Sequence, residues 1–493
     1  MEYIKSEKMG SFRRRGANSN YTGKKNPLRS RAVSRMTAAR EEMRKEMDTF
    51  WGTVKFLTRH FFALLVHLAN PRVTGNRRRC FGYGAVWIWQ AFRLVLFACC
   101  LMPAFVRIGY YYIKSDRVKK GISYGKASRQ NLDIYLPEGL GVSDDGRTPT
   151  SPIRVPVLVF VPGGAWLIGH KCWAALMGKV LAEHGVMVVV PDYRNFPQAR
   201  VGEMLEDVDA SVGWVFKHIK KYGGDTSRIF LSGQSAGAHL SSLSLLSHCD
   251  SATGRRIRRA TSACTPQGFE LDASSRRLRT SWKTSQLAGF IGISGPYDLI
   301  AMAPHIHKRG LSTSVMHSIF KLPVIDIETD DDILFDASSL PPSSFMEAPD
   351  YAETARRLVS CSPTRLIQRM KTRPMQAASL AAQLPRITML HGTADATCPH
   401  FLAVEFRDAV LSACPDHYCE LRLYEGKTHT SPILEDPISG YDPLVSDILE
   451  VIRGHTLENS ADGVPLYRRN SLASQTALAP KWCVSLARAI SPF

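Results

Sequence analysis

The stretch Arg228-Ile229-Phe230-Leu231-Ser232-Gly233-Gln234-Ser235-Ala236-Gly237-Ala238-His239-Leu240 decides how the chain folds. A short apolar run passes through Gly-Gln-Ser-Ala-Gly into small helix-forming residues, which is the strand, turn and helix context of a nucleophile elbow. Gly233 and Gly237 carry no Cβ, so the chain can fold back sharply and expose the hydroxyl of Ser235. The backbone N–H of Ala236 would then point at a developing oxyanion. Because Gly and Ser are common in turns, an ordinary strand-to-helix loop fits the same letters, and the rest of the chain must distinguish the two.

The residues on both sides of this stretch alternate between apolar runs and helical patterns. Val155–Val161 is a continuous apolar run typical of a strand buried on both faces, and Val186–Val190 is another. Residues 203–222 have the spacing of an amphipathic helix that ends at two glycines. A further strand is expected at 287–294, followed by an irregular cap at 295–320. The sequence therefore predicts an α/β fold with a mostly parallel central sheet flanked by helices.

A glycine pair follows the expected strand at 155–161, in Pro162-Gly163-Gly164-Ala165-Trp166. Open α/β sheets bind their ligands at the carboxyl ends of their strands. Paired glycines let backbone N–H groups converge on one oxygen, so Gly163 and Gly164, with the N–H of Ala236, are expected to form an oxyanion hole. An ordinary glycine turn is the alternative.

Two later strands each run into a loop that carries a polar residue, Asp395 in the first and His429 in the second. A serine hydroxyl needs an imidazole to take its proton and a carboxylate to orient that imidazole. Ser235, Asp395 and His429 occur in the chain order of the α/β-hydrolase triad, and we predict that they act together. His391 is better explained as a turn residue, and Asp442 follows the histidine where the carboxylate should precede it.

The motifs P-G-G-A-W, D-Y-R-N-F-P, Y-G-G-D-x-S-R-I, G-Q-S-A-G-A-H, H-x-R-G-L, H-G-T-A-D and Y-E-G-K-T-H-T resemble those of isoprenylcysteine α-carbonyl methylesterases. These are membrane enzymes of the α/β-hydrolase fold, related to hormone-sensitive-lipase-type carboxylesterases. The resemblance covers about residues 124–441, apart from two insertions. One departure from the wider esterase pattern is Pro162, where many relatives have histidine before the glycine pair.

The resemblance implies a serine esterase that hydrolyses the carboxyl methyl ester of farnesyl- or geranylgeranyl-cysteine, releasing the free carboxylate and methanol. It implies no cofactor and no metal, and it assigns the oxyanion hole and substrate binding to Gly163, Gly164, Ala165, Gln234 and Ala236. Another carboxylesterase, or an arylformamidase-like hydrolase, is the alternative within the fold. A catalytically inactive binding module is a further alternative, which the presence of all three triad residues disfavours.

The sequence divides into four regions. We expect a basic, largely disordered segment at 1–49, membrane-associated apolar segments at 50–115, a catalytic domain at 120–455 and a tail at 456–493. The catalytic domain carries insertions near 250–286 and 322–350. Phe50–Ala69 and Gly84–Val106 are the apolar segments, and the second, with only Arg93 charged, is the stronger transmembrane candidate.

Charge and cysteine usage indicate the surroundings of the chain. The net charge of +19 suits an anionic membrane, and neither zinc-finger spacing nor an RNA-binding aromatic signature supports a nucleic-acid partner. Eleven cysteines without a C-x-x-C suit a reducing compartment. The resemblance implies endoplasmic reticulum or Golgi membranes. We expect a cytosolic catalytic domain on an apolar hairpin, and a hairpin too shallow for either segment to cross the bilayer is the alternative to two full spans. Deletion of residues 1 to about 115 is then expected to release a soluble hydrolase.

Overall fold

The computed structural model describes residues 77–140, 152–249, 281–308, 316, 319–320, 357–458 and 477–492. The expected basic segment at 1–49, the first apolar segment at 50–69, the insertion at 322–350 and most of the insertion at 250–286 lie outside these residues. By contacts the chain divides into Met1–Thr49 and Phe50–Phe493, and every described residue belongs to the second unit.

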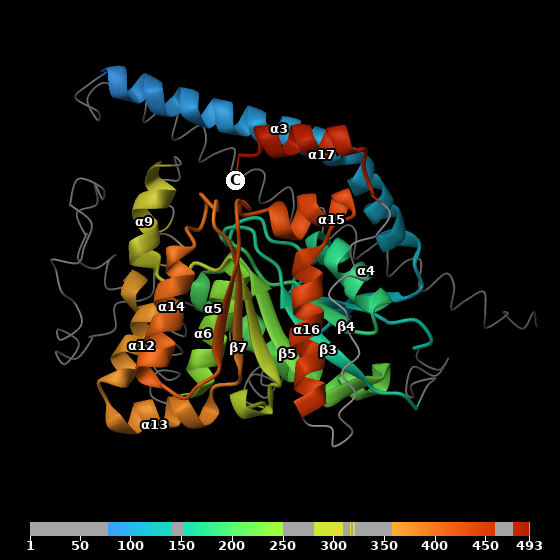
Figure 1. The fold of residues 1–493 in the computed structure, drawn as a ribbon, viewed down its shortest axis with the longest axis vertical. Coiled ribbons are helices and arrows are strands. Elements are labelled where there is room, and N and C mark those ends of the chain that lie inside the picture. The colour runs from blue at the N-terminus through green and yellow to red at the C-terminus, as the bar shows by residue number, and fades with distance from the viewer. Residues whose placement is uncertain are drawn as a thin grey trace, which may run out of the picture. The chain divides into compact units, whose positions relative to one another are not determined.

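The described residues form an eight-stranded sheet with the order β1-β2-β4-β3-β5-β6-β7-β8. β1 pairs antiparallel with β2, and β2 with β4, whereas all later neighbours are parallel. The prediction of a mostly parallel central sheet flanked by helices is confirmed (Figure 1). The strands are β1 (Val118–Ser123), β2 (Asn131–Tyr135), β3 (Val155–Val161), β4 (Met187–Pro191), β5 (Gly224–Gln234), β6 (Gly289–Ile293), β7 (Ile387–Gly392) and β8 (Cys419–Tyr424).

Helices cover both faces of this sheet, as Figure 1 shows. One face carries α5 (Val201–His218), α6 (Ala236–Cys249), α12 (Pro363–Lys371), α13 (Pro374–Gln383) and α14 (Phe401–Ala413). The other carries α4 (Ala175–Glu183), α16 (Pro443–Glu458), α3 (Arg77–Lys114) and α17 (Lys481–Ile490). Shorter elements are η1 (Lys171–Ala174), η2 (Ile219–Tyr222), η3 (Thr284–Gln286), α9 (Leu299–Lys308), a π-helix (Ser431–Glu435) and α15 (Asp436–Ser439).

Side-chain alternation along β3 divides the core into two layers. Val157, Val159 and Val161 belong to the cluster beneath α5 and α6, whereas Leu158 and Phe160 belong to the cluster beneath α4 and α16. A strand buried on both faces reads as an unbroken apolar run, which is why no polar residue interrupts this one.

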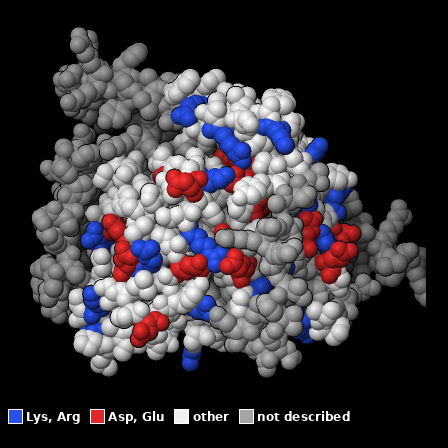
Figure 2. Space-filling view, viewed as in Figure 1, with Lys and Arg blue, Asp and Glu red and all other residues white. Residues whose placement is uncertain are grey.

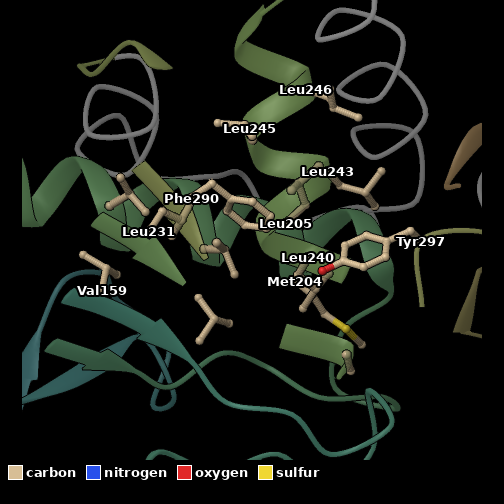
Figure 3. Packing of buried hydrophobic residues seen from close by; sticks show 14 of the residues in the cluster. Val159, Met204, Leu205, Leu231, Leu240, Leu243, Leu245, Leu246, Phe290 and Tyr297 are labelled. Carbon is tan, nitrogen blue, oxygen red and sulfur yellow. The ribbon is translucent and has the colours of Figure 1, made fainter. Parts of the chain in front are cut away.

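The cluster under α6 fixes the helix that follows Ser235. Figure 3 shows Val159 and Leu231 from the strands gathered with Met204 of α5 and with Leu240 and Leu243 of α6. Burial of each such side chain contributes about 1.5–3 kcal/mol relative to leaving it exposed. The amino end of α6 is therefore held firmly against the end of β5.

One face of α3 lies against the domain, and α3 packs against the carboxyl-terminal helix α17 (Figure 1). Its inward side chains Phe97 and Leu101 are buried. Arg93 donates through Nε to the carbonyl oxygen of Ile490 at 3.0 Å and through its guanidinium to that of Ser491. Part of the region expected to be a tail at 456–493 is thus a packed helix, and Arg93 is paired with the carbonyl groups at its end.

Candidate active site

The tight turn expected at Ser235 is present. β5 ends at Gln234, α6 begins at Ala236, and Ser235 between them has φ 54°. This left-handed conformation costs a residue with a Cβ on the order of 1–3 kcal/mol. The N–H of Ser235 donates to the carbonyl oxygen of Ile293 on β6 at 2.9 Å, which ties the strained residue to the neighbouring strand.

Both glycines of the elbow lie where a side chain could not fit. A Cβ on Gly237 would come within 2.0 Å of the carbonyl oxygen of Val161, and one on Gly233 within 2.4 Å of the backbone carbon of Gly237. These are backbone contacts, so no side-chain rotation relieves them. The glycines let the chain reverse while α6 packs directly on β3 and β5.

Asp395 and His429 form a buried pair, with His429 Nδ1 2.7 Å from Asp395 Oδ2. The other carboxylate oxygen accepts the N–H groups of Thr397 and Cys398 at 2.9 and 2.8 Å. Burial alone would raise the pKa of Asp395, but His429 and His391 outweigh it and hold this pKa below its usual range. The carboxylate is therefore ionised at neutral pH and fixes the proton of His429 on Nδ1.

The interpretation of His391 as a turn residue is wrong. His391 is buried on β7, where its Nε2 lies 2.7 Å from the carbonyl oxygen of Cys398 and 3.3 Å from Asp395 Oδ2. It donates to both oxygens and supports the carboxylate that orients His429. Its place four residues before Asp395 was the only signal in the sequence, and it is also compatible with a turn.

The second nitrogen of His429 faces the elbow. Since Nδ1 is the protonated nitrogen, Nε2 is an acceptor, and it lies 3.3 Å from the side-chain amide Nε2 of Gln234. Gln234 precedes Ser235 in the chain, so the acceptor nitrogen of His429 lies beside the elbow. The structure thus brings Ser235, Asp395 and His429, which are distant in sequence, to one end of the sheet.

The glycine pair lies against the elbow. A Cβ on Gly163 would be 2.9 Å from the Cβ of Ser235, and one on Gly164 would be 2.3 Å from the backbone nitrogen of Gly169. Gly164, Ala165 and Trp166 have φ values of 136°, 50° and 62°. Three successive residues with positive φ make a tight turn whose backbone follows the surface of the elbow.

The loop of residues 162–170 is held by the D-Y-R-N-F-P segment, residues 192–197. The sequence alone did not indicate this structural role. The Tyr193 hydroxyl donates to the carbonyl oxygen of Pro162 at 3.0 Å, and Asn195 Nδ2 donates to that of Gly169 at 2.8 Å. The N–H of Phe196 donates to the carbonyl oxygen of Trp166 at 2.9 Å. Three separate bonds therefore fix the strained turn from one side.

The expected cap is described only in part. α9 supplies Leu299–Lys308, and Phe320 packs edge-on against Trp166 with ring centroids 5.1 Å apart. Within the described ranges, no group of three His, Cys, Asp or Glu side chains is placed to hold a metal ion. The chemistry available here is that of a hydroxyl, an oriented imidazole and backbone N–H groups.

A sheet of this order with such an elbow is characteristic of the α/β-hydrolase fold, and the comparisons with known proteins place the chain among carboxylic-ester hydrolases of that fold. The sequence model of the BD-FAE family matches residues 132–326. The chain is 33% identical over 417 residues to the probable isoprenylcysteine alpha-carbonyl methylesterase ICME of Oryza sativa subsp. japonica, covering 84% of this chain and 81% of that one. It is 34% identical to the isoprenylcysteine alpha-carbonyl methylesterase ICME of Arabidopsis thaliana, covering 84% and 79%. The chain belongs to the isoprenylcysteine alpha-carbonyl methylesterase family, and the resemblance in its motifs is confirmed.

Solved esterase structures align with part of the chain. A truncated carbohydrate esterase from gut microbiota aligns with a TM-score of 0.45 at 18% identity, covering 69% of this chain and 96% of that one. Butyrate-bound Est2 of Thermogutta terrifontis aligns with a TM-score of 0.40 at 19% identity, covering 64% and 86%.

Proposed function

We propose that the chain hydrolyses the carboxyl methyl ester of a prenylated cysteine through Ser235, producing the free prenylcysteine carboxylate and methanol. The observation that carries the catalytic part is the Asp395–His429 pair, with its acceptor nitrogen turned toward the elbow. The names of the relatives, isoprenylcysteine alpha-carbonyl methylesterases, support the substrate class.

In the first half of the reaction, the Ser235 oxygen attacks the ester carbonyl carbon while His429 Nε2 takes the hydroxyl proton. The carbonyl oxygen becomes an oxyanion, which the N–H groups of the 163–165 turn and of Ala236 stabilise. When the tetrahedral intermediate collapses, His429 returns the proton to the methoxy oxygen and methanol leaves. The prenylcysteine acyl group is then bound to Ser235 as an ester.

In the second half, a water molecule attacks this acyl ester with His429 again as the base. His429 then passes the proton taken from water to the Ser235 oxygen, and the prenylcysteine acid is released and loses its remaining acidic proton to solvent, giving the carboxylate. Asp395 stays ionised throughout and stabilises the imidazolium that forms twice. Gln234, whose amide lies beside His429 Nε2, is assigned to orienting the imidazole and the bound ester.

The test compares a prenylcysteine methyl ester with the same ester lacking the prenyl group, using the wild-type chain and Ser235→Ala. Wild type should prefer the prenylated ester, and Ser235→Ala should lower kcat by about 10⁴-fold or more. Ser247→Ala is the matched control, because among the described residues the Ser247 hydroxyl bonds its own helix α6 alone, through the carbonyl oxygen of Ser244. Equal hydrolysis of both esters would favour the alternative of a general carboxylesterase, and full activity in Ser235→Ala would refute the mechanism.

We also propose that the domain rests on a membrane through α3 and α17. By length and composition, Phe92–Lys114 is the one described segment able to cross a bilayer. Apart from Leu94, the exposed large apolar side chains of α3 recur at intervals of three, four or seven residues and so form one stripe on the outward face of the helix. They are Trp89, Phe92, Val95, Met102, Val106, Tyr110 and Ile113, and α17 adds Trp482 and Leu486.

The other face of α3 supports an orientation in the plane of the membrane rather than across it. Phe97 and Leu101 are buried against the domain, Arg93 bonds the end of α17, and the Tyr112 hydroxyl donates to Asp133 of β2 at 2.5 Å. A helix held in this way must lose these contacts to cross a bilayer. An in-plane helix keeps them and places its apolar stripe at the acyl boundary.

The charge beside this stripe fits anionic lipid headgroups. Exposed basic side chains flank it, and Figure 2 shows Lys and Arg separated by uncharged surface along the edge where Figure 1 places α3 and α17. A Lys or Arg near an anionic leaflet contributes about 1 kcal/mol to membrane binding. The exposed basic side chains beside the stripe are Arg107, Lys114, Lys120 and Lys481.

The surface also lies next to the histidine loop. Arg488 of α17 pairs with buried Asp436 at 2.7 Å, and Lys427 of the loop that carries His429 pairs with the same carboxylate at 2.8 Å. A prenyl chain partitions into the bilayer, so an esterase that acts on it gains from a cleft close to the lipid. This proximity supports the prenylated substrate over a soluble one.

Vesicle binding tests the surface. The double variant Trp482→Ser/Leu486→Ser should bind vesicles of phosphatidylcholine with phosphatidylserine about 10-fold more weakly, with its melting temperature unchanged. Met375→Ser is the control, since Met375 on α13 is 88% exposed but lies on another part of the domain. Unchanged binding by the double variant would refute the role of α17.

We assign the catalytic domain to the cytosolic face of endoplasmic reticulum or Golgi membranes. The nine cysteines in the described ranges are all free, which suits a reducing compartment, and prenylated cysteines are presented on cytosolic membrane surfaces. Protease treatment of sealed microsomes should digest the domain before detergent is added. Protection until detergent is added would place it in the lumen.

A further inference from the structure

His239 lies one helical turn beyond the nucleophile and is fully buried. It is on α6, and its backbone N–H donates to the carbonyl oxygen of Ser235 at 3.1 Å. Its side chain has 0% exposure and touches neither Asp395 nor His429 in any described hydrogen bond. His239 therefore has no role in the reaction proposed for Ser235, Asp395 and His429.

Both ring nitrogens of His239 have partners on other segments. Nε2 lies 2.7 Å from the carbonyl oxygen of Cys361, which can only accept, so Nε2 carries the proton. Nδ1 is then an acceptor, and the indole Nε1–H of Trp166 donates to it at 3.3 Å. Burial lowers the pKa of His239 to about 4, although the bond to Cys361 opposes this, so the ring is neutral at physiological pH.

Trp166 is the anchor of the strained turn. It has φ 62°, follows Ala165 at φ 50°, and its side chain is 2% exposed. Its ring packs edge-on against the imidazole of His239, with ring centroids 5.4 Å apart, and against Phe320. Residues with a Cβ keep such φ values only where the surrounding structure holds them, and the contacts of the buried indole hold Trp166 here.

We infer that His239 is a positioning residue that keeps the two halves of the oxyanion hole in register. One half is the 163–165 turn, which Trp166 anchors, and the other is the N–H of Ala236 on the helix that carries His239. The imidazole of His239 belongs to α6 and is hydrogen-bonded to the indole of Trp166. It therefore fixes the distance between the turn and the N–H of Ala236. Its second bond, to Cys361, fixes the plane of the ring. This role rests on the proposed esterase mechanism.

A buried histidine could instead serve only to fill the core. The two roles make different demands, because a space-filling role needs the shape of the ring, whereas a positioning role needs the acceptor and the donor. His239→Phe keeps a ring but leaves the indole N–H and the carbonyl oxygen of Cys361 without partners. His239→Gln loses the ring but can present an amide oxygen to Trp166 and an amide N–H to Cys361.

The experiment measures kcat and KM of the full chain on a prenylcysteine methyl ester and on p-nitrophenyl butyrate, with melting temperatures recorded in parallel. His239→Phe should lower kcat about 10- to 100-fold with KM changed less than about 2-fold, because the loss concerns the transition state. His239→Gln should recover most of kcat. Trp166→Phe should reproduce the loss, and the double variant His239→Phe/Trp166→Phe should be no worse than either single one.

Inhibition by a trifluoromethyl ketone analogue of the ester provides a readout that a purely structural role would not change. Its tetrahedral adduct carries the oxyanion, so its Ki should rise in His239→Phe by the same factor by which kcat/KM falls. Ser247→Ala should leave kcat, KM and Ki unchanged.

The outcomes separate the two proposals. A wild-type chain that hydrolyses p-nitrophenyl butyrate but not the prenylated ester refutes the substrate class and leaves the role of His239 testable on the first ester. Full kcat in His239→Phe, or a fall in melting temperature with kcat and Ki unchanged, refutes the positioning role while the esterase stands. Greater activity in His239→Phe than in His239→Gln would identify a space-filling histidine.

Discussion

Around Ser235 the apolar side chains are buried and strained backbone is held by hydrogen bonds, whereas along the outer face of α3 apolar side chains are exposed and no strain is needed. Ser235 itself is 9% exposed at its sheet edge, and Val106 on α3 is 64% exposed. The contrast shows that the two regions are adapted to different surroundings. The elbow suits the polar transition state of the proposed reaction, and the α3 surface suits contact with a non-aqueous phase.

The largest expected effect tests whether the two regions are independent. Ser235→Ala or His429→Ala should lower kcat about 10⁴- to 10⁶-fold, and Asp395→Asn should lower it somewhat less, because each removes a part of one catalytic unit. Vesicle binding should be unchanged in all three. Loss of vesicle binding in Ser235→Ala would show that the elbow and the α3 surface are not separate.

A smaller effect is expected at the glycine pair. Gly163→Ala should lower kcat about 100-fold, since its Cβ would lie 2.7 Å from the carbonyl oxygen of Gln234 and 2.9 Å from the Cβ of Ser235. Gly454→Ala is the matched control, because nothing lies within 4 Å of a Cβ at that position on α16. It should keep full activity and gain about 0.5–1 kcal/mol of stability. Equal activity of the two variants would mean that the turn does not approach the reacting ester.

A third effect concerns stability alone. Burial is the main reason that the pKa of Asp442 is raised to about 7, even though its Oδ1 accepts the N–H of Val445. In the unfolded chain its pKa is about 3.9, so the folded state binds the extra proton between pH 4 and 7 and the wild type loses stability as the pH rises through that range. Asp442→Asn keeps the acceptor and removes the charge.

Asp442→Asn should therefore raise the unfolding free energy by about 2 kcal/mol at pH 8, and the gain should shrink toward zero near pH 4. Thermal unfolding at several pH values measures this, and kcat at pH 7 should be unaffected. A stability difference that does not vary with pH would contradict the raised pKa.

The smallest expected effect distinguishes an in-plane α3 from a spanning one. Arg93→Leu removes the bonds to the carbonyl groups of Ile490 and Ser491, so it should destabilise α17 by about 1 kcal/mol and weaken vesicle binding a few-fold. For a helix that crosses the bilayer alone, the same change removes a charge that costs about 3 kcal/mol and strengthens insertion. Tighter membrane association of Arg93→Leu would therefore contradict the in-plane orientation.

Local patterns were sufficient to predict the sheet and to single out Ser235, Asp395 and His429, which the fold brings to one end of that sheet. The apolar runs mark buried strands, and the turn at Ser235 follows from Gly233 and Gly237, because only glycine fits against β3 and α6. The order in which Asp395 and His429 follow the serine comes from the chain itself, and their 2.7 Å contact follows from the parallel order of β7 and β8.

The partners of single buried side chains could not be predicted. His391 and His239 look like many other histidines in a sequence, and their roles depend on Cys398 and Cys361, which the fold brings to them. The orientation of α3 could not be predicted either, because a spanning helix and an in-plane helix both need a long apolar run. Only its contacts with the rest of the domain distinguish them.

The contact between α3 and α17 has a consequence for how the protein can be divided. A fragment that begins after residue 115 loses Phe97 and Leu101, which share a buried cluster with Cys483 and Val484 of α17, and it also leaves Asp133 without Tyr112. A fragment that ends near residue 456 lacks α17, so it exposes the face of α3 that packs against α17. We therefore revise the expectation that deletion of residues 1–115 releases a soluble enzyme: such a fragment should self-associate, and monodisperse protein should require both α3 and α17 together with a detergent or lipid that covers the α3 stripe.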